Sequence, residues 1–292
     1  MLPKTNKLYY LGLFFLAWII ALVLVPLSFD ELSGYFSFAF LGLIGAIFAN
    51  STGAGGGVVF IPMFNQLGFT PDQAVATSFG IQSFGMTAGA ITWFIHYRKH
   101  TFDLNLWSPF IPIILITSLF SITGIWLIYG LGQGIPGSLN LVFSIFSVVL
   151  GLAILLTVYF SGRAKEHSRL SWYDIVVIVG IGLFGGVITA WLSVGVGELL
   201  ATYLILRRFD ITMAIASAVI VSAITVWFAI PQHTFVNPVI YWQVVIFAGP
   251  AAVIGGIFAR TLVTWLSARK LKIFFGCWVL IMGLSGVIEI II

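Results

Sequence analysis

The sequence has few charged residues and a single cysteine. Only 8% of its 292 residues are charged and 60% are hydrophobic, whereas a soluble globular domain carries about 25% charged residues. So few charges cannot cover a soluble protein of this size. This argues against a cytosolic enzyme, a disordered chain and a nucleic-acid binder. Cys277 has no partner for an intrachain disulfide, and the histidines and carboxylates form no metal-binding pattern. No Walker motif is present, so we expect no cofactor, no metal and no ATP hydrolysis.

Long apolar runs are abundant instead, and the mean hydropathy is +1.13. A helix needs about 20 apolar residues to cross the hydrocarbon core of a membrane. The run at 8–27 is longer than the apolar core of a signal peptide, so we expect it to be a retained first helix. Two runs of about a dozen residues, 56–68 and 196–206, are too short to span, and each follows a glycine-containing break. The expected spans are 8–27, 34–50, 73–97, 105–130, 137–160, 173–193, 212–230, 239–262 and 270–292.

The positive charges predict the topology, because lysine and arginine collect on the cytoplasmic side. In one count, only the nine long spans cross the membrane and the short runs do not change sides. The cations of the 161–172 loop then fall outside. If each short run and the helix before it return the chain to its starting face, all 13 Lys and Arg residues fall on one face. Asp30, Glu31 and Asp72 then fall on the other. We therefore expect a cytoplasmic N-terminus and an extracytoplasmic C-terminus, with each short run either re-entrant or crossing as part of a pair.

An internal repeat is visible at two constant offsets. In the second count each half contains an odd number of segments that reverse the direction of the chain across the membrane. The two halves should therefore enter the membrane from opposite faces, as in many secondary transporters. We predict an all-α polytopic membrane protein with an N-terminal transmembrane helix in 1–33, inverted repeats at 34–160 and 173–292, and a cytoplasmic linker at 161–172. At an offset of 140 the glycine pairs are Gly42–Gly182, Gly45–Gly185, Gly55–Gly195 and Gly57–Gly197, and at 132 they are Gly124–Gly256 and Gly151–Gly283.

Residues 53–62, GAGGGVVFIP, resemble the GxGGGxxxxP signature of the TauE/SafE family. The helix that follows, with AVATS at 74–78, and the segment IGGIFAR at 254–260 are also similar to that family. The resemblance covers the chain after the first helix. It implies a membrane permease of small sulfur-containing anions such as sulfite, sulfoacetate, other organosulfonates or thiosulfate, usually outward. The second repeat departs from the signature: residues 193–202, SVGVGELLAT, lack one glycine and the proline and gain Glu198.

The glycine breaks predict an anion site. A helix that begins inside the membrane presents unpaired backbone N–H groups and the positive end of its dipole, and irregular backbone at that depth must line a polar cavity. The alternatives are that the glycines only let helices pack and that nearby hydroxyls bond to their own helices. The candidate substrate-binding residues are Asn50, Ser51, Thr52, Gly55, Gly56, Gly57, Ser78, Gln82, Ser193, Gly195, Gly197 and Thr202.

Glu198 is the candidate for proton coupling. A carboxylate at membrane depth is costly and marks a functional site by default. An ionised Glu198 would repel a bound anion, and a proton would remove that repulsion. The alternative is a carboxylate that caps its own helix.

These observations favour a multi-pass protein of the cell membrane that works as a secondary transporter of a small sulfur-containing anion. The expected partners are that anion and the lipid bilayer, with no nucleic acid. A passive anion channel of the same fold is the alternative. An enzyme would need paired catalytic groups at membrane depth, and only Glu198 lies there. The sequence does not specify the anion, the direction, the coupling ion or the oligomeric state.

Overall fold

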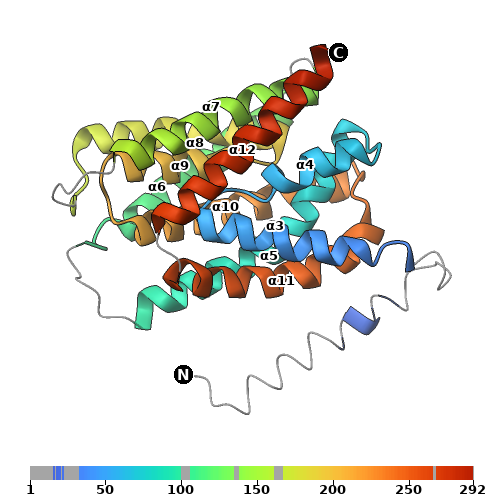
Figure 1. Cartoon of the computed structure of the whole chain (residues 1–292), viewed down its shortest axis with the longest axis horizontal. Helices are drawn as coiled ribbons and strands as arrows, with labels where there is room; N and C mark the ends of the chain where they lie inside the picture. The colour runs from blue at the N-terminus through green and yellow to red at the C-terminus, as the bar shows by residue number, and fades with distance from the viewer. Residues whose placement is uncertain are drawn as a thin grey trace.

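The computed structural model describes residues 16, 18–20, 22, 33–99, 106–134, 138–160, 167–265 and 268–291. Most of the expected first helix at 8–27 and positions 161–166 of the expected linker lie outside the described residues. The described part of the chain is all-helical, with ten α-helices and one short π-helix (Figure 1). They are α3 Ser37–Thr52, α4 Gly57–Gln66, α5 Pro71–Lys99, α6 Phe110–Gly130, α7 Leu139–Phe160, α8 Trp172–Leu192, α9 Val196–Leu206, α10 Ile211–Pro231, η1 Gln232–Val236, α11 Trp242–Trp265 and α12 Ala268–Ile291.

Local side-chain caps fix several helix starts. Before α5, the Gln73 N–H donates to Thr70 Oγ1 and the Thr70 N–H donates to Gln73 Oε1. The same reciprocal capping box joins Ser171 and Asp174 at the start of α8. Asp210 accepts a hydrogen bond from the Met213 N–H at 2.7 Å and so begins α10. Each cap satisfies backbone donors that have no partner within the helix.

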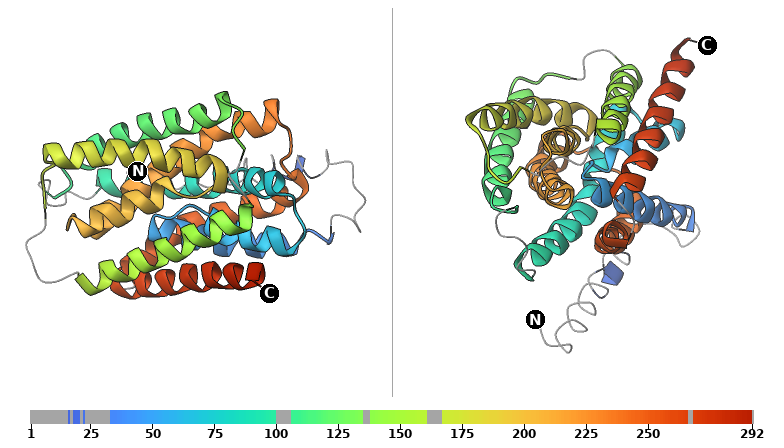
Figure 2. Two further views of the ribbon diagram at one scale, coloured as in Figure 1. Left: turned by 90° about the horizontal axis from the view of Figure 1, so that it is seen from above. Right: turned by 60° about the vertical axis from the view of Figure 1, so that its left-hand side comes forward.

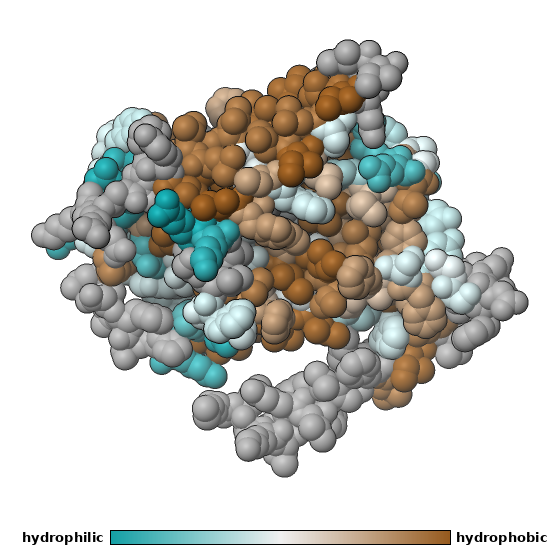
Figure 3. Space-filling model, in the orientation of Figure 1, coloured by the Kyte–Doolittle hydropathy of each residue, from teal (hydrophilic) through white to brown (hydrophobic). Residues whose placement is uncertain are grey.

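Five of the described helices are long and apolar enough to cross a membrane by length and composition: α6, α7, α8, α10 continued by η1, and α11. Shorter apolar helical stretches are Ser37–Thr52, Val196–Leu206 and Lys272–Ile288. Large apolar side chains such as Leu115, Leu119 and Phe184 point outward. Figure 3 shows hydrophobic surface over the middle of the molecule and most hydrophilic residues towards its ends. Such a surface suits a lipid environment.

The principal helix pairs each join the two expected halves of the chain. α3 packs on α11, α6 on α8, α5 on α10 and α7 on α12; Figure 2 shows α7 and α12 side by side. Helix α10 is the most buried of the candidate spans and packs against α5, α6 and α9. The expected repeats therefore interlock and do not form separate bodies.

Glycine permits the close approach of several of these helices. A Cβ on Gly42 of α3 would lie 2.1 Å from the carbonyl oxygen of Ala248 on α11. A Cβ on Gly124 of α6 would lie 2.2 Å from the carbonyl oxygen of Leu183 on α8. No larger residue fits without moving backbone, so these glycines serve helix packing, as small residues do in membranes.

The two ends of the bundle differ in charge. The last turns of α5 and α9 and the first turns of α6, α8 and α12 lie at one end, and the end of α4 and the starts of α5 and α11 lie at the other (Figure 1). A hydrogen bond of 2.8 Å from Ser108 Oγ to the Ser168 carbonyl joins the starts of α6 and α8. Asp72 lies at the opposite end, at the start of α5. The cations at the first end include Arg98, Lys99, Arg169, Arg207, Arg208 and Lys270.

Candidate functional site

The two breaks fold in the same way. The first break, residues 53–56, joins α3 to α4, and the second break, residues 193–195, joins α8 to α9. Gly53, with φ of 82°, and Ser193, with φ of 57°, each end a helix in the left-handed conformation. The Gly53 N–H donates to the Ala49 carbonyl at 3.1 Å, and the Ser193 N–H donates to the Thr189 carbonyl at 2.9 Å. These are ordinary left-handed helix ends, and they recur at the 140-residue offset.

The breaks are in direct and reciprocal contact. A Cβ on Gly57 would lie 2.6 Å from the Ser193 carbonyl oxygen, and a Cβ on Gly197 would lie 2.5 Å from the Gly53 carbonyl oxygen. Gly57 and Gly197 are equivalent at the offset of 140, as are Gly53 and Ser193. The sequence predicted a polar cavity between the breaks. The structure instead brings their backbones together, and side chains take up the free N–H groups.

Glu198 binds the N–H groups of both breaks. Its Oε1 accepts a hydrogen bond from the Gly55 N–H at 2.5 Å, and its Oε2 accepts one from the Gly195 N–H at 2.7 Å. The side chain is 2% exposed. The bond to Gly195 is the local cap that formed the alternative interpretation. The bond to Gly55 comes from the other half of the chain, so the carboxylate does more than cap α9.

Gln82 of α5 joins the same two breaks. Its Oε1 accepts a hydrogen bond from the Gly56 N–H at 2.8 Å, which satisfies the start of α4. Its Nε2 faces the Ser193 carbonyl oxygen at 3.0 Å, Ser193 Oγ at 2.8 Å and Ser78 Oγ at 3.0 Å. Ser193 Oγ also donates to Ser78 Oγ at 3.0 Å. Gln82, Ser78 and Ser193 thus form one buried polar cluster beside Glu198.

Thr189 is a residue of the site that sequence reasoning did not identify. Its Oγ1 accepts a hydrogen bond from the Val196 N–H at 3.1 Å and so caps α9 from the last turn of α8. The available signal was a threonine four residues before Ser193. Its equivalent in the first half is Ala49, so the repeat gave no hint of it.

Ser51 and Thr52 lie next to the first break and outside the polar cluster, although Thr52 Oγ1 accepts a hydrogen bond from the Ala54 N–H of that break at 3.3 Å. Both hydroxyls donate to the Phe48 carbonyl of their own helix, at 3.2 and 2.7 Å. Both residues line a mainly apolar cavity of about 250 Å³ between α3, α11 and α12, with Lys270 in its wall. Their direct contact with substrate stays a prediction that this geometry does not favour.

Asn50 and Thr202 lie outside the hydrogen bonds of the cluster. Asn50 is buried, and its Nδ2 donates to the carbonyls of Ala46 at 2.8 Å and Gly85 at 3.3 Å. It therefore joins α3 to α5. Thr202 is half-buried one turn along α9 from Glu198. Neither residue belongs to the contact between the breaks.

Glu198 is isolated from other ionisable groups along the chain. Residues 36–71, 73–95, 175–192 and 211–231 contain no Asp, Glu, His, Lys, Arg, Tyr or Cys. Helices α3 and α4 and these parts of α5, α8 and α10 therefore bring only backbone, hydroxyl and amide groups to the site. Any negative charge here depends on N–H donors and helix dipoles for its stabilisation.

Two cavities open towards the end of the bundle that carries Asp72. One, of about 260 Å³, extends from Asp72 and Asn237 to Ala190 and Trp191 in the last turn of α8. Because Trp191 lies two residues before Ser193, this cavity approaches the second break from that end.

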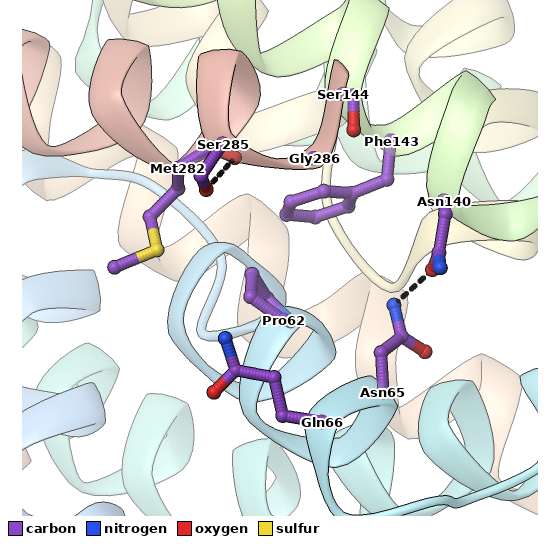
Figure 4. Close-up of a pocket in the computed structure, with 9 residues that line it drawn as sticks. All are labelled: Pro62, Asn65, Gln66, Asn140, Phe143, Ser144, Met282, Ser285 and Gly286. Atoms are coloured by element: carbon purple, nitrogen blue, oxygen red, sulfur yellow. Dashed lines mark hydrogen bonds between the residues drawn. The ribbon is translucent and has the colours of Figure 1, made fainter. Parts of the chain in front are cut away.

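The other cavity, of about 140 Å³, lies between α4, α7 and α12 at the end of α4 remote from the first break (Figure 4). Asn65 Nδ2 donates to Asn140 Oδ1 at 2.5 Å across one side, and the Phe143 ring lies over Pro62. Its lining residues are Pro62, Asn65, Gln66, Asn140, Phe143, Ser144, Met282, Ser285 and Gly286.

Comparison with known proteins identifies one family. No curated protein and no solved structure matches the chain. Residues 38–286 match the family model described as Sulfite exporter TauE/SafE, which confirms the resemblance of the glycine-rich signature at 53–62. The chain therefore belongs to the TauE/SafE sulfite exporter family and is a multi-pass membrane transporter of sulfite-like anions, not an enzyme.

Proposed function

We propose that this chain is a secondary transporter that exports sulfite, sulfoacetate or another organosulfonate through a site at the contact between its two breaks. The observation that carries the proposal is the convergence of N–H groups from both breaks on one buried carboxylate, that of Glu198. A site that binds one oxyanion through N–H donors, with no cation beside it, has the donors that another oxyanion requires. Gly55 and Gly195 supply these donors.

The neighbouring residues give the site its shape. Gly57 and Gly197 allow the two helix starts to touch, and Gln82 holds Gly56 and Ser193 in place with Ser78 behind. Asn50, Ser51, Thr52 and Thr202 form the periphery, where substrate contact requires a different arrangement of α3 and α9. All members of this set were candidates from the sequence.

Proton coupling through Glu198 follows from its isolation. An ionised carboxylate and a substrate anion a few Å apart at low effective dielectric repel each other by several kcal/mol. Protonation of Glu198 removes that repulsion. Because the surrounding segments carry no other ionisable group, the proton has no competing acceptor there.

We also propose that 34–160 and 173–292 are inverted repeats related by a two-fold axis in the membrane plane. The reciprocal contact of Gly57 with Ser193 and of Gly197 with Gly53 supports a two-fold relation, because a two-fold exchanges partners. The pairing of α3 with α11 and of α6 with α8 supports it as well. The cations at one end of the bundle support a cytoplasmic position for that end.

The decisive experiment is flux into proteoliposomes across sulfite, sulfoacetate, thiosulfate, sulfate and taurine, with and without a pH gradient. We expect saturable flux of sulfite or a sulfonate that a pH gradient accelerates. Rapid, non-saturating flux driven only by voltage would favour the passive channel. No flux of any of these sulfur-containing anions would contradict the proposal.

A further inference from the structure

The Glu198 carboxylate has the chemistry of a substrate head group. It is one anionic centre with two geminal oxygens, and each oxygen accepts one N–H from a different half of the chain, Gly55 and Gly195. Sulfite and sulfonates also present geminal oxygens on one centre. Two such groups cannot accept the same two hydrogens at once. Binding of a substrate to Gly55 and Gly195 therefore requires Glu198 to leave.

A third donor near the start of α9 is unused. Ser222 of α10 is 4% exposed, and its Oγ has no hydrogen-bond partner among the described residues. It lies against the first turn of α9, where a Cβ on Gly197 would be 2.2 Å from Ser222 Oγ. At the offset of 140, Ser222 is equivalent to Gln82, which binds the first break. A carboxylate has no third oxygen to offer this hydroxyl, whereas sulfite and sulfonates do.

We propose that Glu198 is an intramolecular ligand of the anion site. A three-oxygen anion replaces the Glu198 carboxylate at the N–H groups of Gly55 and Gly195, and the third oxygen of that anion accepts a hydrogen bond from the Ser222 hydroxyl. This inference rests on the proposed function, since it assigns the same site. In the absence of substrate the carboxylate closes the site. Substrate enters as Glu198 withdraws and takes a proton.

The groups around Glu198 favour this exchange. Helices α7, α8 and α10 pack against α9. The acidic groups of α8 and α10 lie at the far ends, where Asp174 pairs with Arg207 and Asp210 caps α10. No cation faces the carboxylate from 175–192 or 211–231 to hold it in place. Backbone N–H groups alone retain it, those of Gly55 and Gly195 together with its own, and a substrate offers the first two an equivalent acceptor.

The test is refilling of the site by a free carboxylate. Purified Glu198→Ala is compared with wild type for binding of labelled sulfite, with formate as competitor, between pH 6 and pH 8. We expect formate to compete at least about tenfold more strongly in Glu198→Ala, because each charge-assisted hydrogen bond is worth about that factor or more. Sulfite affinity should rise in the variant and lose the part of its pH dependence that comes from Glu198.

Ser222→Ala in the Glu198→Ala background is the matched control for the third oxygen. It should weaken the affinity for sulfite about tenfold and leave the affinity for formate within about twofold, because formate has only two oxygens. Equal weakening of both anions, or of neither, would overturn the role of Ser222.

The outcomes separate this inference from the proposed function. If wild type transports sulfite but formate competes no more strongly in folded Glu198→Ala than in wild type, the inference alone is overturned. If Glu198→Ala binds formate but wild type transports none of the sulfur-containing anions, the proposed function alone is overturned. If Glu198→Ala does not elute as a folded species, Glu198→Gln replaces it. Its amide oxygen satisfies one N–H only, so formate competition should still increase, and an unchanged value overturns the inference.

Discussion

Gly57→Ala tests whether the contact between the breaks is the site. The added Cβ would lie 2.6 Å from the Ser193 carbonyl oxygen and 3.0 Å from that of Leu192, both backbone atoms. Ordinary contact begins near 3.4 Å, so the breaks must separate by about 0.8 Å. If Gln82 stays with the Gly56 N–H, that opening stretches its 3.0 Å bond to the Ser193 carbonyl by up to about 0.8 Å, beyond hydrogen-bond range.

The expected loss follows from these displacements. One neutral hydrogen bond is worth about 1 kcal/mol, and overpacking adds about 1–3 kcal/mol. Together they cost about 2–4 kcal/mol, and where the lower figure falls on the transport step it is about 30-fold in kcat/KM. The assay is sulfite flux in proteoliposomes, with Gly180→Ala as the matched control, because a Cβ on Gly180 meets nothing within 4 Å. Equal kcat/KM and equal thermal midpoints for Gly57→Ala and Gly180→Ala would refute the reasoning.

Three further substitutions probe separate parts of the site and its support. Glu198→Gln mimics the protonated form, so it should bind substrate, more tightly at high pH, yet lose gradient-driven accumulation; an unchanged pH profile of affinity and flux would reduce Glu198 to a helix cap. Gln82→Leu leaves buried donors and acceptors of both breaks unpaired, at about 1–3 kcal/mol each, and should lower the thermal midpoint and the flux together; unchanged values of both would remove Gln82 from the cluster. Arg207→Gln removes the ion pair of the buried Asp174 carboxylate, but Arg207 is 34% exposed and Ser171 and Tyr203 still donate to Asp174, so the loss in a denaturation assay should be about 1–2 kcal/mol. Arg208→Gln should leave the midpoint unchanged; equal midpoints of the two variants would contradict this account.

The helices were predictable because their signal is local. Apolar length, glycine breaks and caps fixed the ranges of α6, α8 and α9 to within a few residues of the expected runs. The offset of 140 also placed the two breaks at equivalent positions before any contact was known. Small differences at helix ends, such as the extension of α5 to Lys99, depend on packing at the end of the bundle. Residues 8–27 lie mostly outside the described part, so the expected first helix stays a prediction.

The side-chain partners were not predictable from the same signals. Whether a hydroxyl reaches a break depends on the rotational phase of its helix, which composition near a break does not reveal. Both hydroxyls donate to a carbonyl of their own helix, but Thr52 accepts only the N–H of Ala54 within the first break, whereas Thr189 accepts the Val196 N–H and so caps α9. The hydrogen bond from Gly55 to Glu198 joins residues 143 positions apart, so it depends on how the two halves meet. Sequence spacing suggested only the local cap at Gly195.

The departure of the second half from the glycine-rich signature has a physical reason in this geometry. At the offset of 140 the equivalent of Glu198 is Val58, which is buried in α4. In the proposed two-fold arrangement the contact has a single central position, and the Glu198 carboxylate there accepts the N–H groups of Gly55 and Gly195. A second carboxylate at position 58 would place two like charges together away from water, at a cost of several kcal/mol. On the proposed function, one anion site is shared by both breaks, so only one half can carry the carboxylate and the repeat differs at this residue.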